Sequence, residues 1–478
     1  MPHTTSLTPG LRTSARRLHT SLRDALSDYR ARGFAVREAD VGLRPNLEIA
    51  GHYRTQFATV PGSSKSGDEP VVLYQTKNGD FPVLLGLFGS RERNEWLLGA
   101  RAREGAHTLM RAALSRPLRP SWVANPPCRE QQAPDRLAAL PTLTSTSQDA
   151  GSFITSGLVC AGEPNSGFVS LSIHRMRVLD DGHLTIWILP GRDLDHLYRQ
   201  AAKAGRALPL SINIGVPPVV YLTSSLSSPL VAPGGGELET AGVLLGRPVE
   251  IARCATNSAF CLAQSEIVIE ASLLQQTVAE SSGSGSDFSM PEFLGYMGKA
   301  QDNLPVVRVS GVFHRRNAIY QTFIGPGKEQ SELLALASEA AILMHLNRVA
   351  EPHLRVKDAH YLAAGGGQLL LVLQVEKRLD HPESMPRLRD AVMQSHALSK
   401  GIIVVDEDVN IHSPEDVFWA LATRFQPSVD LYVSSGAAGF SLDPSQAAGY
   451  LHATNPVTDK YLMDLTVPCH LRPQFVRT

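Results

Sequence analysis

The sequence lacks the long apolar runs and the strong charge that would point to a membrane or to nucleic acid. No apolar run in its 478 residues approaches the roughly 20 residues that span a bilayer. The 45 Lys and Arg residues nearly balance the 46 Asp and Glu residues, so the net charge is −1. The first 20 residues lack the apolar core of a signal peptide. We expect a cytoplasmic protein that binds neither membranes nor nucleic acid.

Several common motifs are also missing. No two of the five cysteines form a CxxC pair, so we expect reduced and mostly buried thiols. None of the 16 histidines belongs to an HxxxH pair of the metalloprotease type. The glycine run after Pro233 lacks the GxGxxG pattern of dinucleotide-binding proteins.

The composition that is present, 43% hydrophobic and 19% charged, is that of a globular protein with two or three domains. Alternating strand and helix patterns predict an N-terminal α/β domain over residues 1–115. Residues 116–330 begin with a proline-rich linker, 116–150, and continue as many strands with few helices. Such a pattern favours a sheet that closes, or nearly closes, on itself. Residues 331–478 predict a long helix and a C-terminal α/β domain, with no clear periodicity after Leu431.

Two carboxylates follow a Ser/Gly run, which predicts a flexible loop, near the middle of the chain. Asp287 and Glu292 come after a Ser-Gly-Ser-Gly-Ser run, and Pro291 restricts the backbone directly before the second acid. Two acids on such a loop suit proton transfer if something separates their pKa values. The alternative is that both are ordinary solvated surface acids.

Seven stretches form a set with a fixed order along the chain. They are Gly167–Val178 (GFVSLSIHRMRV), Ile214–Pro218 (IGVPP), Glu237–Val249 (ELETAGVLLGRPV), Glu266–Glu270 (EIVIE), Asp287–Tyr296 (DFSMPEFLGY), His314–Tyr320 (HRRNAIY) and Lys400–Arg424 (KGIIVVDEDVNIHSPEDVFWALATR). Taken together and in this order, they resemble the UbiD-type decarboxylases, which use prenylated flavin mononucleotide (prenylated FMN). The resemblance implies a split β-barrel that holds the flavin and a C-terminal domain used for oligomerisation.

The resemblance implies a catalytic group in which an arginine lies between two acids. The arginine falls on Arg175, the first acid on Asp287, where the family usually has Glu, and the second on Glu292. Arg175 cannot deprotonate, so it can hold Asp287 ionised and be oriented by it. Glu292, away from the guanidinium and near apolar side chains, is then the expected proton donor. The alternative is a purely structural ion pair between Arg175 and Asp287.

The resemblance also implies a divalent ion that binds the flavin phosphate. The positions of its ligands carry Ser170, Asp193 and Glu237, with Arg192 as the neighbour onto which the second position could slip. An all-oxygen set favours Mg²⁺ or Mn²⁺ over zinc, and K⁺ or Na⁺ can accompany it. The alternative is that Ser170 and Asp193 are ordinary residues and the phosphate is held otherwise, with Arg192 able to neutralise it.

Further flavin contacts are implied at Ile173 and Arg175 on the same stretch, at the pair Ser224 and Ser225, and at Lys400. Hydroxyls with adjacent backbone N–H groups suit phosphate binding. Lys400 follows a predicted helix and could instead interact with the dipole of that helix.

The resemblance therefore implies a carboxy-lyase: a reversible, non-oxidative, prenylated-FMN-dependent decarboxylase of an α,β-unsaturated carboxylic acid. Departures from the ubiquinone-pathway pattern favour a polyketide-type acid of secondary metabolism, such as that of the tautomycetin pathway. Alternatives are an aromatic or heteroaromatic acid as substrate, or a catalytically inactive flavin-binding homologue. A flavin prenyltransferase as cofactor supplier and a homodimer or higher homo-oligomer are implied by the resemblance alone.

Overall fold

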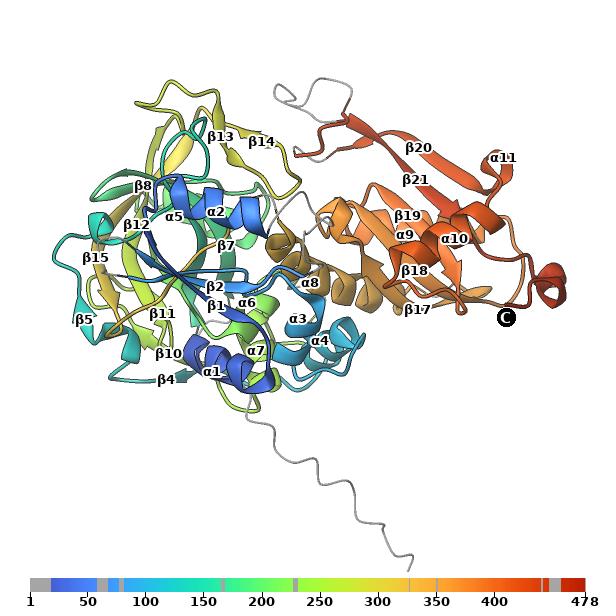
Figure 1. Cartoon of the computed structure of the whole chain (residues 1–478), viewed down its shortest axis with the longest axis horizontal. Coiled ribbons are helices and arrows are strands. Elements are labelled where there is room, and N and C mark those ends of the chain that lie inside the picture. Colours follow the sequence, from blue (N-terminus) through green and yellow to red (C-terminus); the bar gives the residue numbers. More distant parts are fainter. Residues whose placement is uncertain are drawn as a thin grey trace, which may run out of the picture.

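The computed structural model shows two lobes that meet at the long helix α8 (Figure 1). One lobe holds the N-terminal unit and the barrel, and the other holds the C-terminal domain. The structure describes residues 19–57, 68–76, 81–164, 168–226, 231–325, 327–349, 351–439, 442–446 and 457–477. No helix among these residues is long and apolar enough to cross a bilayer.

The N-terminal unit combines four helices with a four-stranded sheet of order β1-β2-β3-β16. Its last strand comes from far along the chain, next to the barrel, so the unit is completed only when the barrel has folded. The elements are α1 (Leu22–Arg32), β1 (Val36–Leu43), α2 (Glu48–Gln56), β2 (Val71–Thr76), β3 (Val83–Leu85), α3 (Arg91–Leu97), α4 (Gly105–Ala113) and β16 (Tyr320–Gln321).

The helical pattern in the sequence spans 22 residues, 11–32, and the first helix of the structure is shorter. It begins after Ser21, whose hydroxyl accepts a hydrogen bond from the backbone N–H of Asp24. It ends at Gly33, and its buried side chains include Leu22 and Tyr29. The beginning of the sequence pattern, before residue 19, and the turn expected at residues 77–80 lie outside the described residues.

Six strands of the middle segment close on themselves, as the strand-rich sequence predicts. They follow the order β12-β9-β6-β7-β8-β15, and β15 pairs again with β12. Apolar side chains fill the barrel, and α5 (Asp193–Lys203) packs onto it. The strands are β6 (Phe153–Glu163), β7 (Phe168–Asp180), β8 (His183–Ile186), β9 (Leu208–Ile214), β12 (Ile267–Val278) and β15 (Leu304–His314).

The proline-rich segment is more than a linker, because it lends two short strands to neighbouring sheets. β4 (Ser121–Trp122) pairs with β10 (Glu250–Arg253), which also pairs with β11 (Phe260–Leu262). β5 (Gln131–Gln132) extends β15. The middle segment also contains α6 (Pro218–Thr223), α7 (Glu237–Leu245) and a hairpin of β13 (Phe288–Pro291) and β14 (Met297–Lys299).

The C-terminal domain is a five-stranded sheet of order β17-β18-β19-β21-β20 with helices on its two faces. The segment after Leu431, which shows no clear periodicity, supplies the last two strands. The elements are α8 (Lys328–Leu346), β17 (Leu354–Tyr361), β18 (Leu370–Lys377), α9 (Ser384–Ser395), β19 (Gly401–Asp406), α10 (Pro414–Arg424), α11 (Pro427–Asp430), β20 (Leu431–Ala438) and β21 (Val457–Asp464).

A buried carboxylate on α8 ties the two lobes together. Glu339 accepts hydrogen bonds from Arg91 of α3 and from the backbone N–H of Tyr361 in β17, at 3.0 and 2.9 Å. His360 Nδ1 lies 3.0 Å from the same carboxylate. Burial opposes ionisation here, but the charge of Arg91 and the bond from His360 hold the pKa of Glu339 at about 2. The ion pair therefore fixes the C-terminal sheet against the N-terminal unit.

Candidate active site

The side chain of Arg175 lies between two glutamates. Its Nε is 3.3 Å from Oε1 of Glu280, its Nη2 is 3.3 Å from Oε2 of the same residue, and its Nη1 contacts Oε1 of Glu292. The three side chains are only 10%, 1% and 11% exposed. On β7, the Arg175 guanidinium lies 4.5 Å from the ring centroid of Trp187, close enough for a cation–π contact. One guanidinium with two carboxylates carries a net charge of −1 when both acids are ionised.

Glu280, just beyond the end of β12, is held by several donors. Ser289 Oγ donates to its Oε1 at 2.8 Å, and the backbone N–H of Gln301 donates to its Oε2 at 3.1 Å. Buried Arg177 donates to the main-chain oxygens of Glu280 and Ser282, the latter at 2.8 Å. These bonds fix the position of Glu280 beside Arg175.

Glu292 lies in the turn of the β13–β14 hairpin. Its backbone N–H donates to Tyr296 O at 2.8 Å, and Gly295 N–H donates to its carbonyl at 2.9 Å. A Cβ atom at Gly298 would lie 2.6 Å from Oε1 of Glu292, so only glycine leaves room for the carboxylate. Among the described residues, Arg175 is the one hydrogen-bond donor to this carboxylate.

The sequence suggested that Asp287 pairs with Arg175, but the structure does not show this pair. Asp287 is exposed, and its main-chain oxygen accepts a bond from Ala300 N–H at 3.0 Å. The Ser/Gly run 281–286 forms an exposed loop, so the acid before the loop, Glu280, points at Arg175 and the acid after it does not. The expected separation of Glu292 from the guanidinium is also wrong, because Arg175 contacts both acids.

Two predicted metal ligands are each the first residue of a helix. Asp193 is the first residue of α5, and Glu237 is the first residue of α7. Burial, and then the negative charge of Asp193, raises the pKa of Glu237 to about 8. A cation between these carboxylates would favour their ionised forms, so the pair fits Mg²⁺ or Mn²⁺. No group of three His, Cys, Asp or Glu side chains suited to a metal occurs in the described residues.

Ser170 and Arg192 lie near this region from different elements. Ser170 on β7 is buried, and its hydroxyl lies 3.3 Å from that of Ser172; the structure gives no contact from it to Asp193 or Glu237. Arg192 caps α5. Burial, and then the charge of Arg192, lowers the pKa of His396 to about 4, which places Arg192 beside the C-terminal domain.

The other predicted flavin contacts are distributed over three elements. Ile173 is on β7 and packs against the core around α6 and α7. Ser224 ends α6, but its hydroxyl donates to Tyr221 O at 2.8 Å, and Ser225 beside it is half-buried. Lys400 Nζ lies 2.7 Å from Asp443 Oδ2 within the C-terminal domain, so it already has an anionic partner.

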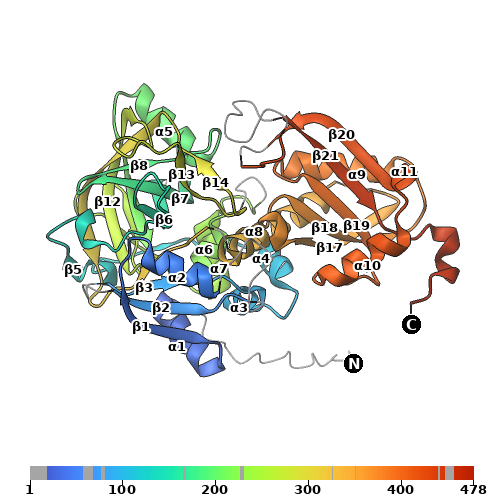
Figure 2. The same ribbon diagram turned by 45° about the horizontal axis from the view of Figure 1, so that its top comes forward.

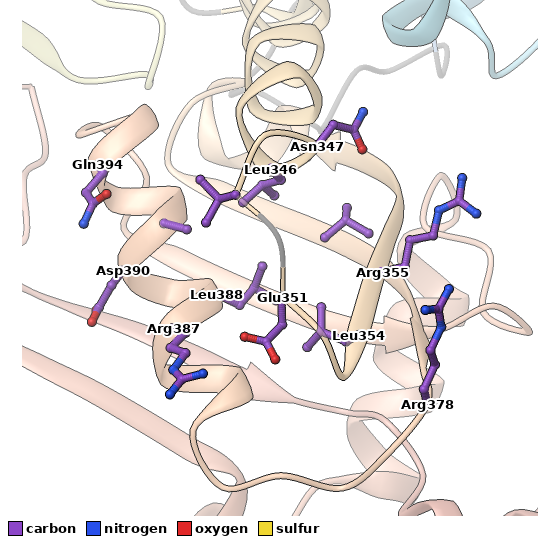
Figure 3. A pocket seen from close by; sticks show the side chains of 13 residues that line it. Leu346, Asn347, Glu351, Leu354, Arg355, Arg378, Arg387, Leu388, Asp390 and Gln394 are labelled. Atoms are coloured by element: carbon purple, nitrogen blue, oxygen red, sulfur yellow. The ribbon is translucent and has the colours of Figure 1, made fainter.

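A separate hollow of about 520 Å³ lies on the C-terminal domain between the end of α8, β17 and α9 (Figure 3). Its floor is formed by leucines such as Leu346 and Leu388, and exposed arginines such as Arg355 and Arg387 stand at its rim. It includes none of the predicted site residues, and Arg175 and its two acids lie elsewhere, on the barrel.

Two family domains match the chain. Residues 121–329 match the Rift-related domain of 3-octaprenyl-4-hydroxybenzoate carboxy-lyase, and residues 332–464 match the C-terminal domain of the same enzyme. Gallate decarboxylase of Lactiplantibacillus plantarum is 32% identical over 462 residues, which cover 92% of each chain.

Solved structures of similar enzymes cover nearly the whole chain. The 3,4-dihydroxybenzoic acid decarboxylase of Enterobacter cloacae superposes with a TM-score of 0.87 at 32% identity, covering 96% of both chains. The UbiD-class enzyme HmfF of Pelotomaculum thermopropionicum in complex with FMN superposes with a TM-score of 0.82 at 31% identity, and the match covers 96% of this chain and 97% of the other.

A closed barrel that presents an arginine between two buried acids, together with these matches, defines a carboxy-lyase. The chain belongs to the UbiD family of decarboxylases.

Proposed function

We propose that this protein is a prenylated-FMN-dependent decarboxylase in which Arg175, Glu280 and Glu292 form the catalytic group. The observation that carries the proposal is the placement of Arg175 between two nearly buried acids. HmfF structures that contain FMN or prenylated FMN, at 31% and 30% identity, support the cofactor. A flavin prenyltransferase would supply it. The intact charged group argues against a catalytically inactive homologue.

The three residues have distinct roles in this proposal. Glu280 accepts bonds from Arg175, Ser289 and Gln301, and these bonds let it hold Arg175 in place. Glu292 has fewer donors, so it is the acid that carries a proton and gives it to the substrate carbon that has lost CO₂. Arg175 orients both carboxylates and can hold the substrate carboxylate before the reaction. Prenylated FMN, when bound, supplies the electron sink that loss of CO₂ requires.

The flavin phosphate and its ion are expected beside Asp193, Glu237 and Arg192. The two carboxylates suit Mg²⁺ or Mn²⁺, with K⁺ or Na⁺ as a further ion, and Arg192 adds a positive charge. Ser224, Ser225, Ile173 and Lys400 remain proposed contacts; the bond from Lys400 to Asp443 would have to open first.

Replacement of Glu237 by Gln is expected to lower the flavin that stays bound after desalting by about 10-fold, because one metal ligand is lost. Glu239→Gln, in the same first turn of α7, is the matched control and should retain the wild-type amount. Absorbance of the released flavin measures the ratio per chain. Equal flavin in both variants would contradict the metal assignment.

The substrate is proposed to be a hydroxylated aromatic acid. Gallate decarboxylase and 3,4-dihydroxybenzoic acid decarboxylase, both 32% identical to this chain, support this class over the α,β-unsaturated polyketide acid, which stays a prediction. A panel of hydroxybenzoic, furoic and alkenoic acids, followed by CO₂ release, tests the choice. Turnover confined to the alkenoic acids would favour the polyketide-type substrate of secondary metabolism.

We also propose that the protein forms a homodimer through the edge of the C-terminal sheet. Within the described residues β20 pairs only with β21, and it exposes Leu431 and Val433, next to the exposed Val429 of α11. An apolar edge of this kind is expected to be covered by a partner.

Val433→Lys is expected to convert the dimer to a monomer in light-scattering chromatography, because a charge would be buried in the interface. Leu379→Lys, which also replaces an exposed apolar residue of this domain by lysine, should leave the dimer intact. A dimer that survives Val433→Lys, or a monomeric wild type, would refute this interface.

A further inference from the structure

The turn that carries Glu292 reaches from the barrel to the C-terminal domain. Figure 2 shows the β13–β14 hairpin directed across the space between the two lobes. Phe293, the next residue in the turn, is 8% exposed. Its ring is therefore covered although it lies at the tip of a hairpin.

A glycine of the C-terminal domain, Gly366, lies close against Phe293. A Cβ atom at Gly366 would lie 2.4 Å from Cε2 of Phe293 and 2.8 Å from Cδ2 of Leu294. Both distances are far below the ordinary carbon–carbon contact of about 3.5 Å. The contact thus requires a residue without a side chain at position 366.

Gly366 is itself held firmly to α8 through its own segment. Its N–H donates to Ala363 O at 2.8 Å, and its φ is 67°. Its neighbour Gly367 packs so closely that a Cβ there would lie 2.1 Å from Ser331 O of α8. The C-terminal domain, and not the hairpin, therefore fixes the position of Gly366.

A second glycine lies close to the backbone of the same turn. A Cβ atom at Gly325, in the segment before α8, would lie 2.4 Å from Pro291 O and 3.0 Å from the carbonyl carbon of Glu292. The backbone at Glu292 is therefore packed against Gly325, and the next two side chains are packed against Gly366.

We propose that Gly366 is a positioning residue: through its contact with Phe293, the C-terminal domain sets the place of Glu292 beside Arg175. The inference rests on the proposed role of Glu292 as proton donor. A side chain at position 366 must push the Phe293 ring, and with it the turn. A displacement of about 1 Å at a catalytic group can cost about 100-fold in rate.

The test compares Gly366→Ala with Gly436→Ala. Gly436 on β20 has a φ of 71°, close to that of Gly366, but a Cβ there would meet nothing within 4 Å. The control therefore carries the same backbone strain without the contact. We expect kcat of Gly366→Ala to fall at least ~10-fold with flavin content unchanged, and that of Gly436→Ala to stay near wild type.

Two further readouts separate positioning from general damage. The solvent deuterium isotope effect on kcat should rise in Gly366→Ala, because proton transfer from a misplaced Glu292 becomes slower. Hydrogen–deuterium exchange in residues 288–299 of the flavin-free protein should also rise, and it should not rise in Gly436→Ala.

Phe293→Ala provides a second route if Gly366→Ala does not fold. It removes the contact from the barrel side and should itself lower kcat and raise exchange in residues 288–299. In the double variant, Gly366→Ala should add a smaller loss than it causes alone, because the ring is gone and only the contact with Leu294 remains. The inference would be overturned if the kcat losses of Gly366→Ala and Phe293→Ala were additive in the double variant. It would also be overturned if Phe293→Ala had the kcat of the wild type, or if the two glycine variants had equal kcat. Normal turnover by Glu292→Gln would instead overturn the proposed function.

Discussion

Glu292→Gln is expected to lower kcat by at least ~100-fold while the amount of bound flavin stays unchanged. The amide keeps the shape of the side chain but has no acidic proton to give to the substrate carbon. The loss should also be specific, because Glu292 lies in a hairpin turn and the amide preserves its size.

Steady-state CO₂ release at saturating substrate measures this effect, and flavin absorbance is read on the same sample. A solvent exchange assay adds a second readout, because incorporation of deuterium from D₂O into the product should slow in parallel. Near-normal turnover by Glu292→Gln would remove Glu292 from the role of proton donor.

The second large effect is expected at Glu280 and not at Asp287. Glu280→Gln should lower kcat by about 100-fold, because the charge that holds Arg175 in place is lost from a site that is 1% exposed. Asp287→Asn should remain within about 2-fold of the wild type, since its side chain is in solvent.

The two variants are a matched pair: each changes one carboxylate to its amide, and the residues are seven positions apart. Both are measured for kcat, for flavin content and for melting temperature. The reverse order, with Asp287→Asn inactive and Glu280→Gln active, would restore the assignment made from the sequence.

These two acids also show how far the sequence alone could lead. The resemblance assigned Arg175 and Glu292 to one catalytic group, and the structure brings them together, although Glu292 was expected away from the guanidinium. The sequence placed the first acid on Asp287, in the same stretch as Glu292. The Ser/Gly run 281–286 lengthens the loop, so Glu280 at its start reaches Arg175.

A signal for Glu280 was present in the sequence. Glu280 lies two residues beyond the end of β12 and directly before a flexible Ser/Gly run. An insertion in such a loop separates the acid after it from the acid before it. Arg177, which holds the main chain of Glu280, had no such signal, since its role depends on contacts between distant segments.

The fold was more predictable than the contacts within it. The sequence patterns of residues 237–245 and 414–424 predict helices, which are α7 and α10 in the structure, and the strand-rich segment closes as a barrel. The six-residue helix α6 was missed because all its residues are buried and it has no polar face. The pairing of β16 with β3 could not be predicted, because it joins parts of the chain that are far apart in sequence.

The most direct test of the central claim is CO₂ release from hydroxylated benzoic acids by protein produced together with a flavin prenyltransferase. The account predicts prenylated FMN near one per chain, CO₂ release that depends on this cofactor, and no release by protein that contains FMN alone. Protein that binds prenylated FMN near one per chain but releases no CO₂ from any acid of the panel would contradict it.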